Sequence, residues 1–167
     1  MHEFDHLPYR PCAGVMLVNH EGRIFIGQRM DDASEAWQMP QGGIDEGEDA
    51  QTAALRELHE ETGVDPRFVT VVAQSKDDHR YDLPDELKGR IWGGKYRGQC
   101  QSWFLLQFNG MDSDINIATA HQEFRSWRWA DPDQVQETVV PFKRALYKAI
   151  LAEFAPLIPG KTNSSQA

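Results

Sequence analysis

The feature that most constrains the fold of this chain is an acidic, helix-forming segment between Gly42 and Gly63. Seven of its residues are acids and one, Arg56, is a base, so the segment contributes −6 to the formal net charge of −9. From Asp49 to Thr62 it contains neither glycine nor proline, and Gly63 stands where helices commonly end. We therefore predict a helix over residues 49–62, inside the segment that carries most of the net charge.

Three acids of this helix point to metal binding. Glu57, Glu60 and Glu61 fall within about 100° of one another around the helix axis. Like charges one turn apart repel each other, and a solvated helix face more often mixes its signs. A divalent cation would remove the repulsion, and carboxylate oxygens suit Mg²⁺ or Mn²⁺ better than zinc. Taken alone, the same residues also fit an acidic face exposed to solvent.

The rest of the chain predicts strands and a second helix around this segment. The expected strands are 14–18, 24–29, 68–74, 101–108 and 123–129. The first two form a hairpin, residues 30–41 form a loop, and a long loop joins the third strand to the fourth. Apolar residues spaced four apart from Phe142 predict a closing helix over 141–154. We expect one domain over residues 1–160 and a disordered tail over 161–167.

Composition limits the class of protein. With 40% hydrophobic and 26% charged residues, the chain is globular rather than disordered, collagen-like or disulfide-rich. No run approaches the roughly 18 apolar residues of a membrane span, and residues 1–6 lack a signal-peptide pattern, so we expect a cytoplasmic protein without a membrane partner. Cys12 and Cys100 are expected to be reduced and buried. The acidic balance argues against general nucleic-acid binding, DNA included, but permits a metal between protein acids and a substrate phosphate.

The loop before the helix adds a spacing that is specific to one family. Gly42 and Gly43 permit close backbone approach, and Glu48 stands where a helix N-terminus favours an anion. Arg56 lies two helical turns from Glu48 and can form an ion pair with it. Five residues separate Gly42 from Glu48, and seven more separate Glu48 from the triplet Arg56-Glu57-Leu58. One residue then precedes the pair Glu60-Glu61, and one more precedes Gly63-Val64. This pattern resembles the Nudix box of the Nudix hydrolases, with every defining position filled.

Other segments extend the resemblance from Tyr9 to about Phe154. Five of these segments are similar to the bacterial RNA pyrophosphohydrolase branch, namely YRPCAGVML, WQMPQGGID, WFLLQF, EFRSWRW and VVPFKRALY. Members of this branch are also described as dinucleoside polyphosphate hydrolases. IWGGKYRGQCQSWF is also similar to asymmetric diadenosine tetraphosphate hydrolases. The resemblance implies an α/β Nudix fold, an α/β/α sandwich around a mixed sheet, and attack by water. Ser102 departs from the branch, which commonly has a basic residue there, and this puts one phosphate contact in question.

The resemblance also implies roles for individual acids. Glu57, Glu60 and Glu61 match the metal-binding glutamates, and Glu123 matches a further acid outside the box. Two or more Mg²⁺ or Mn²⁺ ions held there would polarise phosphate oxygens and lower the pKa of a bound water. The expected catalytic residues are Glu57, Glu60 and Arg56. We favour Glu57 as the base that accepts the water's proton, with Glu60 and Glu123 as alternatives.

Substrate contacts are expected from scattered bases and aromatic residues. Those expected to contact phosphates are Arg10, Arg29, Lys143 and the acid-free segment 88–97. Tyr81 and Phe142 are expected to stack on nucleotide bases. Each basic residue by itself also fits a solvated charge, and Phe142 could instead begin the core face of the last helix.

Two activities fit this machinery. One removes pyrophosphate from the 5′-triphosphate end of RNA, and the other cleaves diadenosine tetraphosphate, a dinucleoside polyphosphate, to ATP and AMP. A nucleotide-binding regulatory module without activity would require a broken box, which this sequence does not have. The sequence favours the RNA activity, keeps the dinucleotide activity as the alternative, and leaves the oligomeric state open.

Overall fold

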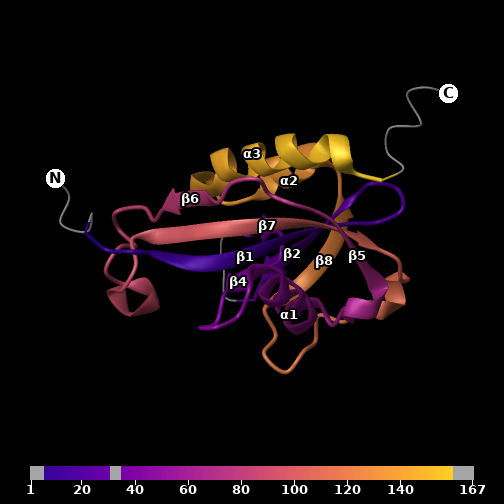
Figure 1. The fold of residues 1–167 in the computed structure, drawn as a ribbon, viewed down its shortest axis with the longest axis horizontal. Helices are drawn as coiled ribbons and strands as arrows, with labels where there is room; N and C mark the ends of the chain where they lie inside the picture. The colour runs from indigo at the N-terminus through magenta and orange to yellow at the C-terminus, as the bar shows by residue number, and fades with distance from the viewer. Residues whose placement is uncertain (1–5, 31–34, 160–167) are drawn as a thin grey trace.

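Two long strands, β1 and β7, run side by side through the centre of the molecule (Figure 1). The computed structural model describes residues 6–30 and 35–159. β1 pairs in parallel with β7 from Tyr9 opposite Gly98 to Val18 opposite Gln107. All other strand pairs are antiparallel, so the eight strands form a mixed sheet. The strands are β1 (Tyr9–Val18), β2 (Ile24–Arg29), β3 (Trp37–Gln38), β4 (Gln41–Gly43), β5 (Val69–Gln74), β6 (His79–Asp82), β7 (Gly98–Phe108) and β8 (Phe124–Ala130).

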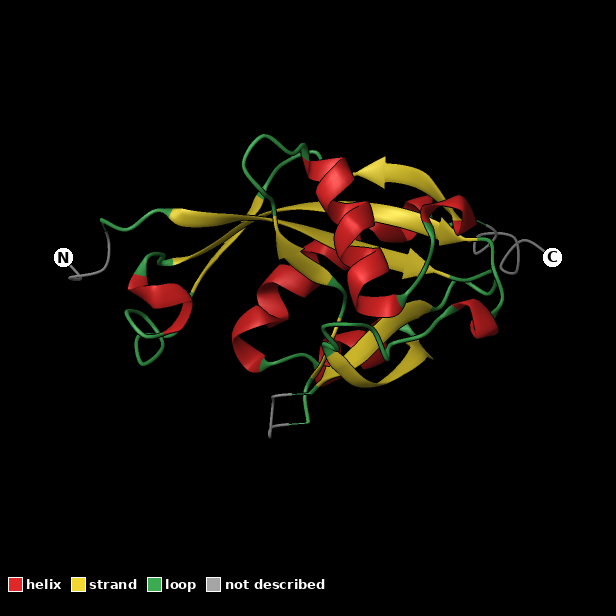
Figure 2. Ribbon diagram, turned by 90° about the horizontal axis from the view of Figure 1, so that it is seen from below, coloured by secondary structure: helices red, strands yellow, loops and turns green. Residues whose placement is uncertain are grey.

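Helices cover both faces of this sheet (Figures 1 and 2). The α-helices are α1 (Ala50–Thr62), α2 (Pro132–Thr138) and α3 (Arg144–Phe154). The short 3-10 helices are η1 (Pro66–Phe68), η2 (Ile91–Gly94), η3 (Asp112–Asp114), η4 (Pro141–Lys143) and η5 (Ala155–Leu157). α1 packs on one face, and α2 and α3 pack on the other. This arrangement confirms the expected α/β/α sandwich.

The alternation of side chains along β1 explains why there are two cores. Val15 and Leu17 belong to the cluster that includes Leu58 of α1, whereas Met16 and Val18 belong to the cluster that includes Ile150 of α3. Successive side chains of a strand point to opposite faces, so a strand that is apolar at every position can stabilise both layers. The near-continuous burial of β1 therefore places it between the helices.

The acidic helix forms where the sequence predicts it. Asp49 is the N-cap, and its Oδ1 accepts a hydrogen bond from the backbone N–H of Thr52 at 2.7 Å. Gly63 ends the helix with a φ of 72°, a left-handed conformation that favours glycine. The five predicted strands are also present, although β1 and β7 begin earlier than expected, at Tyr9 and Gly98.

Four details of the expected secondary structure are wrong. The loop expected over 30–41 contains β3 and the first residue of β4, and the long loop before β7 contains β6. Strands of two to four residues are too short to show a hydrophobic period. The helix expected over 141–154 begins with η4, and α3 starts only at Arg144. α2 was not predicted, because its seven residues are mostly polar and bury only Val135.

Three other expectations have mixed outcomes. Cys12 and Cys100 are both free thiols, but Cys12 is buried and Cys100 is partly exposed, so burial is wrong for Cys100. In the described ranges, no helix has the length and apolar character required to cross a membrane. The tail expected to be disordered, 161–167, lies outside the described residues.

Candidate active site

A cavity of about 1010 Å³ lies where α1, β4, β6, β7 and η4 meet. Its lining includes most residues selected from the sequence, although these are spread over more than 130 positions of the chain. The selected residues that line it are Arg10, Arg29, Gly42, Gly43, Glu57, Glu60, Glu61, Tyr81, Glu123, Phe142 and Lys143. Arg56 and Glu48 are not among the lining residues.

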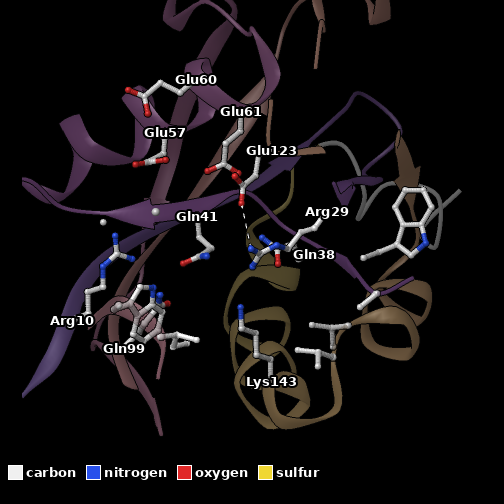
Figure 3. A pocket seen from close by; sticks show the side chains of 18 of the residues that line it. Arg10, Arg29, Gln38, Gln41, Glu57, Glu60, Glu61, Gln99, Glu123 and Lys143 are labelled. Atoms are coloured by element: carbon white, nitrogen blue, oxygen red, sulfur yellow. Dashed lines mark ion pairs between the residues drawn. The ribbon is translucent and has the colours of Figure 1, made fainter. Parts of the chain in front are cut away.

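α1 presents its acids to the cavity at different depths. Glu61 is 5% exposed, the Glu57 side chain is 15% exposed, and the Glu60 side chain is 54% exposed. Glu123 lies just before β8, and Figure 3 shows its carboxylate next to that of Glu61. A side chain at Gly42 would overlap the Glu57 carboxylate, so the close approach of β4 to α1 requires glycine there. Glycine at this position lets α1 place Glu57 directly against β4.

Arg56 joins the loop, the start of the helix and the acids. Its Nε and Nη2 donate to the two carboxylate oxygens of Glu48 at 2.8 Å each, in a bidentate pair. Nη2 also donates to the carbonyl of Gly43 at 2.9 Å. Nη1 donates to Glu57 at 3.0 Å and to Glu60 at 3.2 Å. The hydrogen bonds from Arg56, together with the backbone N–H of Asp45, lower the pKa of Glu48 to about 2. Arg56 therefore acts on the site by holding other groups.

Glu61 is the most buried acid of this cluster. Its Oε1 is buried and has no hydrogen-bond partner in the described part of the chain. Burial raises the pKa of Glu61 well above its ordinary value, and the neighbouring Glu57 and Glu123 raise it further. A buried carboxylate with acidic neighbours and an unpaired oxygen is a donor set suited to Mg²⁺ or Mn²⁺. The chemistry of these donors thus suits the expected divalent metal, although within the described ranges no three acidic, histidine or cysteine side chains converge closely enough to hold an ion in the present arrangement.

The opposite side of the cavity carries cationic and aromatic groups. Lys143 is 6% exposed, and its Nζ lies 5.5 Å from the centre of the Tyr81 ring. The rings of Tyr81 and Phe142 are 5.8 Å apart, centre to centre. Phe142 is half-buried and lines the cavity, whereas Leu146, Ile150 and Phe154 belong to the core. Phe142 is therefore placed for contact with a ligand.

Two arginines approach the cavity from different sides. Arg29 reaches Glu123, with Nη2 3.8 Å from Oε1 (Figure 3). The guanidinium of Arg10 lies 5.4 Å from the ring centre of Trp92, which also lines the cavity. Trp92 was missed in the sequence because a lone tryptophan in a loop carries no periodic signal.

The acid-free segment contributes less to the cavity than expected. Lys88 is 8% exposed, and its Nζ lies 3.5 Å from carboxylate oxygens of Asp82 and Asp85. Arg97 donates to Asp82 at 2.7 Å. Lys88, Arg90, Lys95 and Arg97 do not line the cavity. Lys88 and Arg97 hold this loop to β6, and this placement gives no support to their expected phosphate contacts, which stay a prediction.

Three glutamines of the lining were also missed. Gln38, Gln41 and Gln99 come from β3, β4 and β7 and reach the cavity from below the carboxylates in Figure 3. Gln99 and Gln101 are each 1% exposed. Gln99 and Gln101 stand at alternate positions of a largely buried strand, a signal that sequence analysis could have used, because buried amides need partners.

Comparison with known proteins gives a consistent result. Residues 8–150 match the family described as NUDIX domain. A protein of Sphingopyxis alaskensis named RNA pyrophosphohydrolase is 62% identical over 158 residues, which cover 95% of this chain and 100% of that protein.

Two solved structures share the fold at low identity. The E. coli dihydroneopterin triphosphate pyrophosphohydrolase is 22% identical with a TM-score of 0.68, covering 87% of this chain and 99% of that one. The C. elegans Ap4A hydrolase is 18% identical with a TM-score of 0.62, covering 87% of this chain and 98% of that one. At these identities the two structures establish a common fold and nothing further.

Proposed function

The chain belongs to the Nudix family of hydrolases, and we propose that it is an RNA pyrophosphohydrolase. In this reaction water attacks the 5′-triphosphate end of a transcript, pyrophosphate leaves, and a 5′-monophosphate remains. The observation that carries the proposal is a single cavity with carboxylates on one side and cationic and aromatic groups on the other. The name of the Sphingopyxis relative, at 62% identity over nearly the whole chain, supports this choice of substrate.

Metal ions belong to this proposal. Nudix hydrolases generally use divalent metals, and we assign two or more Mg²⁺ or Mn²⁺ ions to Glu57, Glu60, Glu61 and Glu123. When bound, such ions would polarise phosphate oxygens and lower the pKa of the attacking water. Glu61 supplies a buried oxygen that has no hydrogen-bond partner among the described residues, and Glu123 brings a second carboxylate beside it.

Glu57 is the best placed base. Arg56 donates to one of its carboxylate oxygens at 3.0 Å, and the loop at Gly42 packs against it, so the group is held in one position. Glu60 has a more exposed side chain, and Glu123 is already paired with Arg29. A base must lie within reach of the proton in a fixed geometry, which favours Glu57. Arg56 is a positioning residue in this scheme, because it holds Glu57.

The other side of the cavity provides substrate contacts. We assign phosphate binding to Arg10, Lys143 and Arg29, all of which line the cavity. Arg10 and Lys143 lie on the side away from the carboxylates, whereas Arg29 lies beside Glu123. Tyr81 and Phe142 form a joint aromatic surface on which a base can stack. Such contacts tolerate different bases, so they suit an enzyme that acts on many transcripts. Since transcripts are made in the cytoplasm, we propose that the protein acts there.

The alternative substrate is a dinucleoside polyphosphate. The C. elegans Ap4A hydrolase has the same fold, but its 18% identity carries no argument about substrate. The deciding experiment is competition between triphosphorylated RNA and diadenosine tetraphosphate in one reaction. We expect a higher kcat/KM for the RNA. A clear preference for diadenosine tetraphosphate would overturn the proposed function in favour of the alternative.

A further inference from the structure

Three side chains on one face of β7 form a hydrogen-bonded chain from the core to the cavity. Gln99, Gln101 and Trp103 occupy alternate positions of the strand, so they point to the same side of the sheet. Trp103 is fully buried against α3, where its ring makes an edge contact with Tyr147 at 5.9 Å. Of the three strand residues, Gln99 lines the cavity. These hydrogen bonds thus connect the buried Trp103 to the cavity.

Trp103 determines the direction of this hydrogen-bonded chain. Its Nε1–H donates to Oε1 of Gln101 at 2.7 Å, and an indole nitrogen cannot accept a hydrogen bond. If the Gln101 amide were turned round, its NH₂ group would face the indole N–H and both donors would lose their partner. Gln101 therefore directs its NH₂ toward the cavity, where Nε2 donates to Oε1 of Gln99 at 2.5 Å. A weaker bond from the same Nε2 reaches Oε1 of Gln41 at 3.4 Å.

The geometry leaves Gln99 with its amide hydrogens available. Its oxygen is occupied by Gln101, and in the described part of the chain no group accepts a hydrogen bond from its Nε2. Its partner across the β1–β7 pairing is Arg10. Figure 3 shows Arg10, Gln99 and Gln41 on the side of the cavity opposite Glu57 and Glu61. This corner presents a guanidinium and an amide donor toward the space between them and the carboxylates.

Gly14 of β1 makes room for the Trp103 ring. Gly14 lies between Gln41 of β4 and Trp103 of β7 in the strand pairing. A Cβ atom at Gly14 would come within 2.5 Å of the Trp103 ring. The indole can therefore lie across β1 and reach Gln101 because this position is glycine.

We propose that Nε2 of Gln99 binds a phosphate oxygen of the substrate, and that Gln101, anchored by Trp103, is a positioning residue that keeps this amide in its donating orientation. An amide turned round would present its oxygen to the phosphate and repel it. The inference rests on the proposed function in one respect, since it takes the ligand to be a polyphosphate, a group common to triphosphorylated RNA and dinucleoside polyphosphates.

The test of the binding role uses inorganic tripolyphosphate as a competitive inhibitor, because this probe has phosphates and no base. Gln99→Met removes the donor at similar size, and we expect its Ki for tripolyphosphate and its KM for triphosphorylated RNA to rise together by about tenfold. Gln107→Met is the matched control, since Gln107 is buried near the other end of β7 and its Nε2 donates to backbone carbonyls of Val18 and Phe108. The control variant should keep the wild-type Ki. An unchanged Ki in Gln99→Met would overturn the phosphate contact, even if KM for RNA rose.

The positioning role is tested by a double-mutant cycle. Gln101→Met alone should raise the Ki for tripolyphosphate about fivefold, because Gln99 loses the bond that orients it. In the Gln99→Met background the same change should add less than twofold, since no donor remains to be positioned. Effects that multiply would show that Gln101 acts only on the structure at large, and would overturn its positioning role. If Gln101→Met does not fold, Gln101→Asn replaces it, because the shorter amide cannot bridge Trp103 and Gln99.

These measurements can fail separately from the proposed function. Should the wild-type enzyme prefer diadenosine tetraphosphate to RNA, the RNA assignment falls, but the Ki values for tripolyphosphate still decide the role of Gln99. Conversely, an unchanged Ki in Gln99→Met leaves the preference for RNA intact.

Discussion

The two sides of the cavity are built in different ways. The carboxylate side comes mainly from one stretch, α1 and the segment before it, and Glu123 joins it from the residue before β8. The opposite side combines Arg10 of β1, Tyr81 of β6, Gln99 of β7 and Lys143 of η4. Acids on one helix keep their positions relative to one another even if the strands of the sheet shift. The chemistry therefore depends on local structure, whereas substrate contacts depend on how distant strands pack.

The largest expected effect concerns the metal on the carboxylate side. Chelation by EDTA should abolish turnover of triphosphorylated RNA, because the crowded acids need cations before a polyphosphate can approach them. Added Mg²⁺ or Mn²⁺ should restore the rate, and thermal melting in EDTA should show that the protein remains folded. Full activity in chelator, or recovery with Zn²⁺ alone, would contradict the oxygen-ligand site.

The next effect tests a single acid of that side. Glu57→Gln keeps the shape of the side chain and removes its charge, so kcat should fall by about 10² or more. The melting temperature without metal should stay the same or rise, because repulsion with Glu61 is relieved. Glu46→Gln is the control, since Glu46 is an exposed acid of the same segment outside the cavity lining. Activity of the Glu57 variant within threefold of wild type would rule out a catalytic role.

The opposite side should show a selective effect on binding. Phe142→Ala should raise KM for RNA by roughly tenfold or more, in line with about 1 to 3 kcal/mol per stacked base, with kcat little changed. Because Phe142 is half-buried and outside the core clusters, the melting temperature of the Phe142→Ala variant should fall only slightly.

Phe154→Ala provides the contrast, because Phe154 is the last residue of α3 and is fully buried in the core. It should cost about 3 to 5 kcal/mol of unfolding free energy and affect RNA and diadenosine tetraphosphate equally. If Phe142→Ala behaved in the same way, with an unchanged ratio between the two substrates, its stacking role would be refuted.

A smaller effect is expected from Arg56, which links the loop to the acids. Arg56→Lys keeps the charge but cannot form the bidentate pair with Glu48 or also reach Gly43 and Glu57, so kcat should fall about fivefold. The unfolding free energy should fall by about 1 kcal/mol. Arg67→Lys, an exposed change outside the cavity, controls for the substitution itself. Equal kcat in both variants would show that Arg56 does not position Glu57.

The smallest effect is on acid stability. The pKa of Glu48 is about 2 in the folded protein against an ordinary 4.5, because Arg56 and the backbone of Asp45 donate to it. A carboxyl group with a lowered folded pKa stabilises the fold above about pH 4.5, and this contribution disappears as the pH falls toward 2. Glu48→Gln should therefore lower the melting temperature at pH 7 and leave it nearly unchanged near pH 2. A loss of the same size at both pH values would exclude the ion pair as its cause.

The sequence by itself determined the family, the acidic helix and its two ends. These features depend on neighbours along the chain: Asp49 caps the first turn, Gly63 adopts the left-handed conformation, and Glu57 and Glu61 lie one turn apart. Such interactions span a few residues, so their spacing is visible in the printed sequence.

The tertiary structure alone decided which bases and amides reach the cavity. Lys88 and Lys143 are both nearly buried lysines, yet the first pairs with Asp82 while the second faces the cavity beside Tyr81. Gln99 gains its role from Trp103 through Gln101, and Trp103 can reach Gln101 because Gly14 on another strand makes space. Each outcome depends on strand register and on contacts between residues far apart in sequence. A single sequence does not encode those contacts as a pattern, because they arise only when the strands pair.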